Sequence, residues 1–159
     1  MGSRPYFTGI ISVLICMWLA LPAAAACRDD TVELRGDWGQ ARFSVDLAQT
    51  AAERSQGLMF VENMPASRGM LFIYPDEQPV AFWMQNTLIP LDMIFADATG
   101  LIHKVHSNAI PGDTTAIDGG TSRFVLEING GLAQAIGLTA GSELRHPSVP
   151  RDGAVWPCD

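Results

Sequence analysis

The sequence predicts a single mainly-β domain of the sandwich or barrel type, with one or two short helices. Short segments that are apolar, or that alternate apolar and polar residues, recur along the chain between glycine- and proline-bearing turns. A parallel α/β fold needs helical patterns of about 10–15 residues between its strands, and the sequence contains none.

The first elements are two strands and a capped helix. Residues 31–35 and 41–47 alternate apolar and polar side chains, which predicts two half-buried strands. Thr50 and Glu53 have the spacing of a capping box. A short helix is therefore expected to follow Thr50 and to stop at Gly57.

The middle of the chain predicts two strand pairs. Residues 70–74 and 80–84 are apolar segments on either side of a proline-bearing turn. Residues 91–96 and 101–105 are expected to form a hairpin around 97–100, where a glycine suits a positive φ angle.

The last third of the chain is less regular. Residues 106–122 are predicted to be a long loop and residues 123–128 a strand. Asn129 is expected to cap a short helix over 131–136. A final strand is predicted at 142–145.

The N-terminus has the features of a signal peptide, residues 1–26. Its single charge, Arg4, precedes an apolar segment, and the segment ends in four alanines that offer cleavage near Ala26. Cleavage leaves residues 27–159 as one domain, without a transmembrane span, in the periplasm or outside the cell.

The charge balance excludes some classes of partner. The chain has a formal net charge of −7, and Lys104 is its only lysine. An acidic surface without a basic cluster repels phosphate backbones and anionic lipids. We therefore expect no nucleic-acid binding, and the partner is expected to be a small molecule or a protein.

Two cysteines remain after cleavage, because Cys16 lies within the predicted signal peptide. An even pair in an oxidising compartment suggests a disulfide between Cys27 and Cys158, which would join the two ends of the mature chain. The alternative is that Cys27, directly after the alanines, carries the lipid of a membrane-anchored lipoprotein.

Four motifs resemble the family catalogued as domain of unknown function 192, and the likeness extends over about residues 32–145. The resemblance implies a compact, mainly-β, often exported domain, and it implies no activity. Gln85 stands where the family more often has a lysine. The motifs are T-x-x-E-R-x-x-G-L-M from Thr50, G-M-L-F from Gly69, F-W-M-x-N-T-L-I-P-L-D-x-I-F from Phe82, and V-L-E from Val125.

The third motif also indicates a site, because polar residues interrupt its apolar run and unpaired polar groups are costly to bury. We predict a pocket where the helix after Thr50 meets the loop of residues 83–92. The predicted ligand-binding residues are Arg54, Asn86, Asp92 and Glu127 as polar contacts, with Met59 and Trp83 as the apolar wall.

Arg54 and Glu127 allow two interpretations. They could form a bidentate ion pair that attaches the helix to the sheet. Alternatively, Arg54 could bind the carboxylate of a ligand.

Asp92 and His103 are the candidate catalytic residues. A tight hairpin at 97–100 would place Ile94 opposite His103 and Asp92 diagonal to it, within reach of a general-base contact. The alternative is structural, with Asp92 accepting hydrogen bonds from backbone amides of the loop at 86–90 and His103 half exposed.

No metal or cofactor is expected. His103 and His106 would point to opposite faces of a strand, and His146 is remote in sequence. The methionines lie in apolar runs, where they fill core space. The sequence contains no nucleophile elbow and no phosphate-binding glycine loop.

These features favour a small-molecule-binding or accessory module. The first alternative is a small hydrolase or lyase that uses Asp92 and His103, so the sequence leaves open whether the protein is an enzyme. The second is an assembly partner without a small ligand. An enzyme should place such a pair in an open cleft, whereas an assembly partner should expose an apolar patch.

Overall fold

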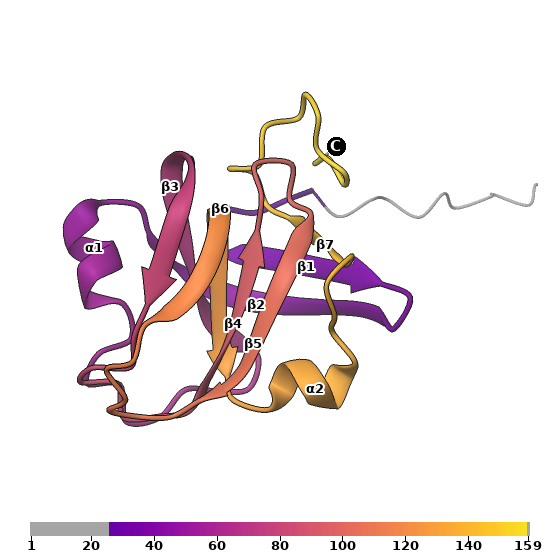
Figure 1. Cartoon of the computed structure of the whole chain (residues 1–159). Coiled ribbons are helices and arrows are strands. Elements are labelled where there is room, and N and C mark those ends of the chain that lie inside the picture. The colour runs from indigo at the N-terminus through magenta and orange to yellow at the C-terminus, as the bar shows by residue number, and fades with distance from the viewer. Residues whose placement is uncertain (1–25, 159) are drawn as a thin grey trace, which may run out of the picture.

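The computed structural model describes residues 26–158, so the predicted signal peptide lies, apart from its last residue, outside the described residues. Seven strands form one sheet in the order β5-β4-β6-β3-β2-β1-β7, and two short helices accompany it (Figure 1). The prediction of a mainly-β fold is confirmed. The strands are β1 Thr31–Gly36, β2 Gly39–Ala48, β3 Arg68–Phe82, β4 Leu91–Ala96, β5 Ile102–Ala109, β6 Ile117–Asn129 and β7 Glu143–Arg145, and the helices are α1 Ala51–Gln56 and α2 Leu132–Ile136.

Neighbouring strands are antiparallel, except that β2 and β3 run parallel. Two consecutive strands that run parallel need a crossover connection, because a tight turn can join only antiparallel strands. Helix α1 lies in this crossover, and Figure 1 shows it beside β3 at one side of the sheet. The crossover thus brings α1 beside β3, which is the fourth of the seven strands in the sheet order.

The sheet curls until its outer strands meet. Leu101, just before β5, forms a bridge with Glu143 of β7. Two further backbone hydrogen bonds join these edges, from Ile102 N to Ser142 O at 2.8 Å and from Leu144 N to Gly100 O at 2.8 Å. The result is a barrel-like half-closed sheet.

The two faces of the sheet bury separate apolar clusters. Leu71, Ile94 and Leu126 belong to the cluster inside the curl. The residues next to them in the chain, such as Phe72 and Val125, belong to the cluster on the opposite face, which includes Leu58 from the segment after α1. All six residues of β4 are buried, because this strand is covered on both faces.

The two ends of the described chain are joined. Cys27 and Cys158 form the expected disulfide, with their Cα atoms 5.7 Å apart. The tail that carries Cys158 folds back on the sheet edge, where Trp156 lies 4.4 Å from the guanidinium of Arg35 and 4.3 Å from that of Arg145. Within residues 26–158, no helix is long and apolar enough to cross a membrane.

Two predicted loops are wrong in extent. The expected turn at 75–79 belongs to one long strand, β3, whose register against β6 shifts between Ile73 and Gln78. The expected loop over 106–122 is shorter, because β5 continues to Ala109 and β6 begins at Ile117. Both errors arise because polar residues of these strands lie on exposed sheet ends, where no apolar alternation marks them.

Candidate functional site

Helix α1 is fixed by the predicted capping box. The Thr50 hydroxyl accepts a hydrogen bond from Glu53 N at 3.2 Å, and the Glu53 carboxylate accepts one from Thr50 N at 2.8 Å. The helix ends at Gly57, whose φ of 48° suits a residue without a Cβ, and Leu58 then enters the core. The arrangement holds the last turn of α1 over the sheet.

A small hollow of about 40 Å³ lies beneath this turn, and we call it the α1 hollow. Four of the six predicted ligand-binding residues line it, namely Arg54, Met59, Trp83 and Glu127. The other lining residues are Ser55, Gln56, Gly57, Leu58, Phe72, Phe82 and Thr87. The predicted meeting of the helix with the loop after β3 is therefore present in the structure.

Glu127 forms the inner wall of the α1 hollow. It lies on β6 between Met70 of β3 and Met93 of β4, and its side chain is only 4% exposed. Its carboxyl group makes no hydrogen bond with another residue in the described range, and its oxygens are not among the enclosed side-chain atoms without a partner there, so they open onto the hollow. Burial raises its pKa to about 8, because the apolar surroundings disfavour the charged form. The group is therefore a neutral carboxylic acid at pH 7.

Arg54 faces the same hollow from α1 without pairing with Glu127. One of its guanidinium nitrogens, Nη1, donates to the backbone carbonyls of Gln49 and, at 3.0 Å, of Ile73. The guanidinium lies 4.8 Å from the ring centroid of Tyr74. The structural alternative of an Arg54–Glu127 ion pair is wrong within the described residues, because backbone carbonyls take the place of the carboxylate.

Tyr74 is a site residue that the sequence analysis missed. It lies against the guanidinium of Arg54, and burial is the main cause that raises the pKa of its phenol, with the Glu127 carboxyl adding to the rise. Its only sequence signal was its place at the end of a strand, next to a proline. The sequence separation between Arg54 and Tyr74 could not reveal their contact, because the crossover that joins α1 to β3 lies between them.

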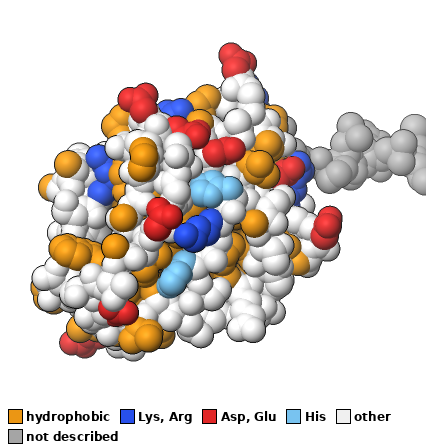
Figure 2. Space-filling model, viewed as in Figure 1, with side chains coloured by type: hydrophobic (Ala, Val, Ile, Leu, Met, Phe, Trp, Pro, Cys, Tyr) orange, Lys and Arg blue, Asp and Glu red, His pale blue; other side chains and the backbone are white. Residues whose placement is uncertain are grey.

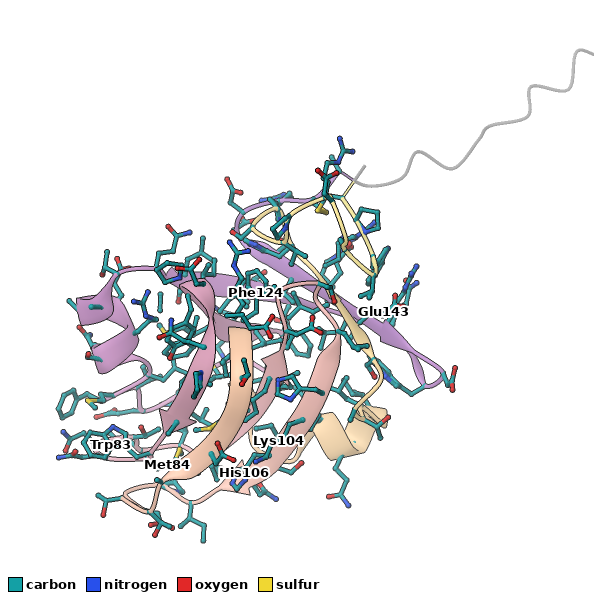
Figure 3. All side chains as sticks on the ribbon, turned by 45° about the horizontal axis from the view of Figure 1, so that its top comes forward. Trp83, Met84, Lys104, His106, Phe124 and Glu143 are labelled. Atoms are coloured by element: carbon teal, nitrogen blue, oxygen red, sulfur yellow. A yellow bond between two sulfur atoms is a disulfide. The ribbon has the colours of Figure 1, made fainter. Side chains whose placement is uncertain are left out.

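Trp83 forms the outer rim of the hollow, with 52% of its surface exposed. On its other side lies a more apolar groove of about 280 Å³, lined by Ala81, Phe82, Trp83 and Ala116. Figure 3 shows Trp83 at the end of the molecule that is farthest from the C-terminal tail. Phe82 and Trp83 line both depressions, so the two are neighbours.

The loop that carries Trp83 is held by the loop after α1. Phe60 N donates to Asn86 O at 2.9 Å, and the Asn86 amide lies 3.9 Å from the Met59 sulfur. Phe60 and Asn86 both have positive φ angles, 65° and 57°. Such conformations cost about 1–3 kcal/mol each and concentrate at functional sites. Asn86 thus positions the rim and does not itself line the hollow.

Asp92 lies on the other face of the sheet and is fully buried. Its carboxylate accepts three backbone hydrogen bonds, from Asn108 N and Gly131 N at 2.8 Å and from Ala133 N at 2.7 Å. The structural alternative, in which Asp92 accepts hydrogen bonds from backbone amides, is correct. The amides belong to the end of β5 and to the start of α2, however, and not to the loop at 86–90. Asp92 therefore caps α2 and does not contact the α1 hollow.

The predicted cap of α2 is correspondingly wrong. The N-cap is Gly131, which has no side chain, and Asn129 instead donates to the carbonyls of Met64 at 2.9 Å and Pro65 at 3.2 Å. Asn129 therefore fastens the loop before β3, and Asp92 of β4 accepts the hydrogen bonds of the first amides of α2 in its place.

The predicted contact between Asp92 and His103 is also wrong. Ile94 lies opposite Val105 rather than His103, because the turn closes at Asp97 and Leu101, one residue later than predicted, and the β4–β5 pairing shifts by one more residue between Phe95 and Ala96. His103 Nε2 instead lies 2.9 Å from the hydroxyl of Ser122.

Ser122 is fully buried, and its hydroxyl donates to Gly119 O at 3.0 Å. His103 must therefore donate to Ser122 and cannot act as its base in this arrangement. The Ser122–His103 contact is structural, and it offers a hydrolase neither an accessible nucleophile nor a free base.

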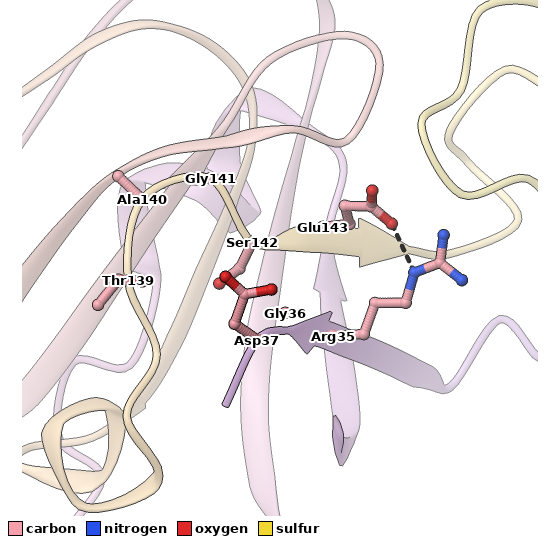
Figure 4. A pocket seen from close by; sticks show the side chains of 8 residues that line it. All are labelled: Arg35, Gly36, Asp37, Thr139, Ala140, Gly141, Ser142 and Glu143. Carbon is pink, nitrogen blue, oxygen red and sulfur yellow. Dashed lines mark hydrogen bonds and ion pairs between the residues drawn. The ribbon is translucent and has the colours of Figure 1, made fainter. Parts of the chain in front are cut away.

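Two further depressions contain charged side chains. The first, of about 420 Å³, contains Lys104 and His106 of β5 and Asp118 of β6, and Figure 2 shows histidine and lysine side chains side by side with a carboxylate on this face. The second, of about 310 Å³, lies between β1 and β7, where Arg35 and Glu143 form an ion pair at 2.5 Å (Figure 4). Among the described residues no group of three or more His, Cys, Asp or Glu side chains is arranged to hold a metal ion.

The fold and the α1 hollow define a small curled-sheet domain with one buried acid beside a capped helix. The chain belongs to the domain of unknown function 192 family, described as an uncharacterised ACR, whose sequence profile matches residues 32–146. This match confirms the family resemblance that the four sequence motifs indicated. The chain matches no curated protein with significant similarity.

Two solved structures share the fold. A protein of unknown function from Novosphingobium aromaticivorans is 38% identical, with a TM-score of 0.70, and the match covers 72% of this chain and 82% of that one. A protein from Sinorhizobium meliloti, described as a "putative transcription regulator", is 35% identical, with a TM-score of 0.71, over 76% of this chain and 95% of that one.

Proposed function

We propose that the protein is an exported small-molecule-binding module whose site is the α1 hollow. The observation that carries this proposal is Glu127, a buried carboxyl group that faces the hollow and has no hydrogen-bond partner among residues 26–158. A ligand that enters the hollow supplies a hydrogen-bond partner to this carboxyl group.

The size of the hollow limits what it can hold. Its volume of about 40 Å³ is far below the roughly 300–1,000 Å³ of sites that enclose a drug-sized ligand. One polar group of a ligand fits there, so the remainder must lie outside, against the exposed face of Trp83. Aromatic side chains with one wet and one apolar side commonly form such contacts.

Export is supported by the disulfide and by the sequence of residues 1–26. Disulfides form and persist in oxidising compartments such as the periplasm. The sulfur of Cys27 is bonded to Cys158, so the same sulfur cannot carry a lipid while this bond exists. We therefore favour a disulfide-bonded protein over the lipoprotein alternative.

An assembly role is the second candidate, because large apolar side chains are exposed. Phe60 and Ile110 are each 66% exposed, and Trp83 and Leu88 are each 52% exposed. Such side chains favour a protein contact when they form one patch. A DNA-binding role, which the description of the Sinorhizobium protein would suggest, is disfavoured by the net charge of −7 and the single lysine.

Native mass spectrometry of the protein purified from the periplasm tests the proposal. We expect an adduct of small mass that is retained by the wild-type protein and lost in Trp83→Ala. Leu88→Ala is the matched control, because Leu88 is equally exposed and lies outside the hollow. An adduct that survives Trp83→Ala, or a wild-type protein that is free of adducts and gains none from periplasmic extract, contradicts the proposal.

A further inference from the structure

The chemistry of the α1 hollow specifies the kind of group it receives. Its inner wall is a carboxyl group that is neutral at pH 7, and a neutral carboxyl group has one proton to donate. Its α1 side carries the guanidinium of Arg54, whose Nη1 is held by two backbone carbonyls. A hydrogen-bond donor and a cation therefore face one small space.

We infer that the ligand is an amphipathic carboxylic acid, with its carboxylate in the α1 hollow between Glu127 and Arg54 and its apolar body in the groove beside Trp83. This inference rests on the proposed function and names its ligand class. A carboxylate accepts the Glu127 proton in a strong charge-assisted hydrogen bond and attracts the guanidinium. A cationic head group would instead meet Arg54 and find no ionised partner at pH 7.

The apolar part follows from the neighbouring groove. Phe82 and Trp83 line both the hollow and the groove, so one molecule can occupy the two depressions. The groove adds about 280 Å³ and is lined by Ala81 and Ala116 besides the two aromatic residues. A ring or short alkyl chain attached to the carboxylate through a few carbons matches this arrangement.

Among the residues that line the α1 hollow, Arg54 and Glu127 are the two with ionisable side chains. Across the sheet, Met70 and Met93 separate Glu127 from the next residues on either side. The titratable or charged groups that face it are Arg54 of α1, Tyr74 of β3, Arg123 of β6, Asp46 of β2, which is paired with Arg68, and His106 of β5.

Arg54 is therefore the charge that a ligand in the hollow meets first. The negative net charge of the whole protein acts over longer distances and is largely screened beyond about 8 Å at physiological ionic strength.

The shared proton makes binding depend on pH. The bound pair needs Glu127 in its acid form and the ligand in its carboxylate form, so that one proton lies between two carboxyl groups and no proton is released. Since the pKa of Glu127 in the unliganded protein is about 8, the affinity is constant between the pKa of the ligand's own carboxyl group and pH 8, and it falls about tenfold for each pH unit above 8. A cationic ligand would show the opposite dependence, binding more tightly as Glu127 ionises.

Three probes with one apolar body separate these cases: 4-phenylbutyrate, 4-phenylbutyramide and 4-phenylbutylamine. Each is titrated into the disulfide-bonded protein at pH 6.5 and pH 9, and the indole N–H signal of Trp83 is followed by NMR. We expect saturable binding of the carboxylate at pH 6.5 that is about tenfold weaker at pH 9, with the amide weaker and the amine weakest. In Glu127→Gln, which keeps a neutral donor, the carboxylate should bind more weakly and without the pH dependence.

Preferential binding of the amine, or carboxylate binding that strengthens with pH, overturns the ligand class while the proposed binding function stands. Absence of saturable carboxylate binding up to 10 mM (roughly the weakest Kd that a fragment of this size gives) also overturns it. The proposed function is tested separately by native mass spectrometry, and it fails if the wild-type protein neither retains nor gains an adduct, or if the adduct survives Trp83→Ala. Leu88→Ala should leave all three titrations unchanged and shows whether the exposed apolar side chains act nonspecifically.

Discussion

The buried acid of the α1 hollow should make the protein less stable as the pH rises. Burial raises the pKa of Glu127 from its ordinary value of 4.5 to about 8. Between these two values the folded state holds a proton that the unfolded state has released. The stabilising contribution is complete below pH 4.5 and is lost as the pH rises through 8, at about 1.4 kcal/mol per pH unit. From pH 5.5 to 8 the loss is about 3 kcal/mol.

Substitution Glu127→Gln removes this dependence, because the amide stays neutral at every pH. The free energy of unfolding is measured by urea titration with circular dichroism between pH 5.5 and 9, with the disulfide intact. The difference between wild type and variant should fall by about 3 kcal/mol over the range and then level off. Subtraction cancels other titrations, such as that of His146, whose pKa is lowered by burial in both proteins.

Glu62→Gln is the control for loss of a carboxylate, because Glu62 is exposed. Its difference from wild type should stay flat. A flat difference for Glu127→Gln as well would show that Glu127 is already ionised in the folded protein, and the argument for a neutral acid in the hollow would be refuted.

Three other changes test the fold around the site. Asp92→Ala should lower the free energy of unfolding by about 3–5 kcal/mol, because three backbone amides lose the carboxyl group that accepts their hydrogen bonds. A loss below about 1 kcal/mol in urea titration would contradict that role. Replacing Cys27 and Cys158 together by serine should cost roughly 4–5 kcal/mol in the same assay, because the bond closes a loop with a sequence separation of 131, and unchanged stability would show that the ends are held by other contacts. Gly69→Ala should lower the stability by about 1–3 kcal/mol, since the new Cβ would lie 2.4 Å from the backbone carbonyl oxygen of Glu127. A variant as stable as wild type in thermal unfolding would mean that β3 and β6 can move apart there without cost.

Features that depend on near neighbours in the chain were predictable from the sequence. Thr50 and Glu53 form their capping box as expected, because both partners lie within one helical turn. Four of the six residues predicted for the pocket, Arg54, Met59, Trp83 and Glu127, line the α1 hollow. The polar residues of the motif from Phe82 to Phe95 were a poorer guide, because Asn86 positions the rim and Asp92 accepts hydrogen bonds on the other face of the sheet.

Features that depend on exact register were not predictable. A turn one residue longer than predicted and an irregularity between Phe95 and Ala96 together move Val105 opposite Ile94, and this removes His103 from Asp92. Nothing in an apolar alternation reveals such a bulge, because the side chains before and after it are still apolar. The acceptor role of Asp92 toward Ala133 was equally hidden, since it joins residues that are distant in sequence.

The joined ends of the chain suggest how the protein could be rebuilt. With the Cα atoms of Cys27 and Cys158 only 5.7 Å apart, a linker of about two or three residues can connect the ends by peptide bonds. New termini can then be opened at Gly112, in the exposed loop between β5 and β6. Such a circular permutant would keep the sheet order and the α1 hollow while needing no oxidation, so it could be produced in a reducing cytosol.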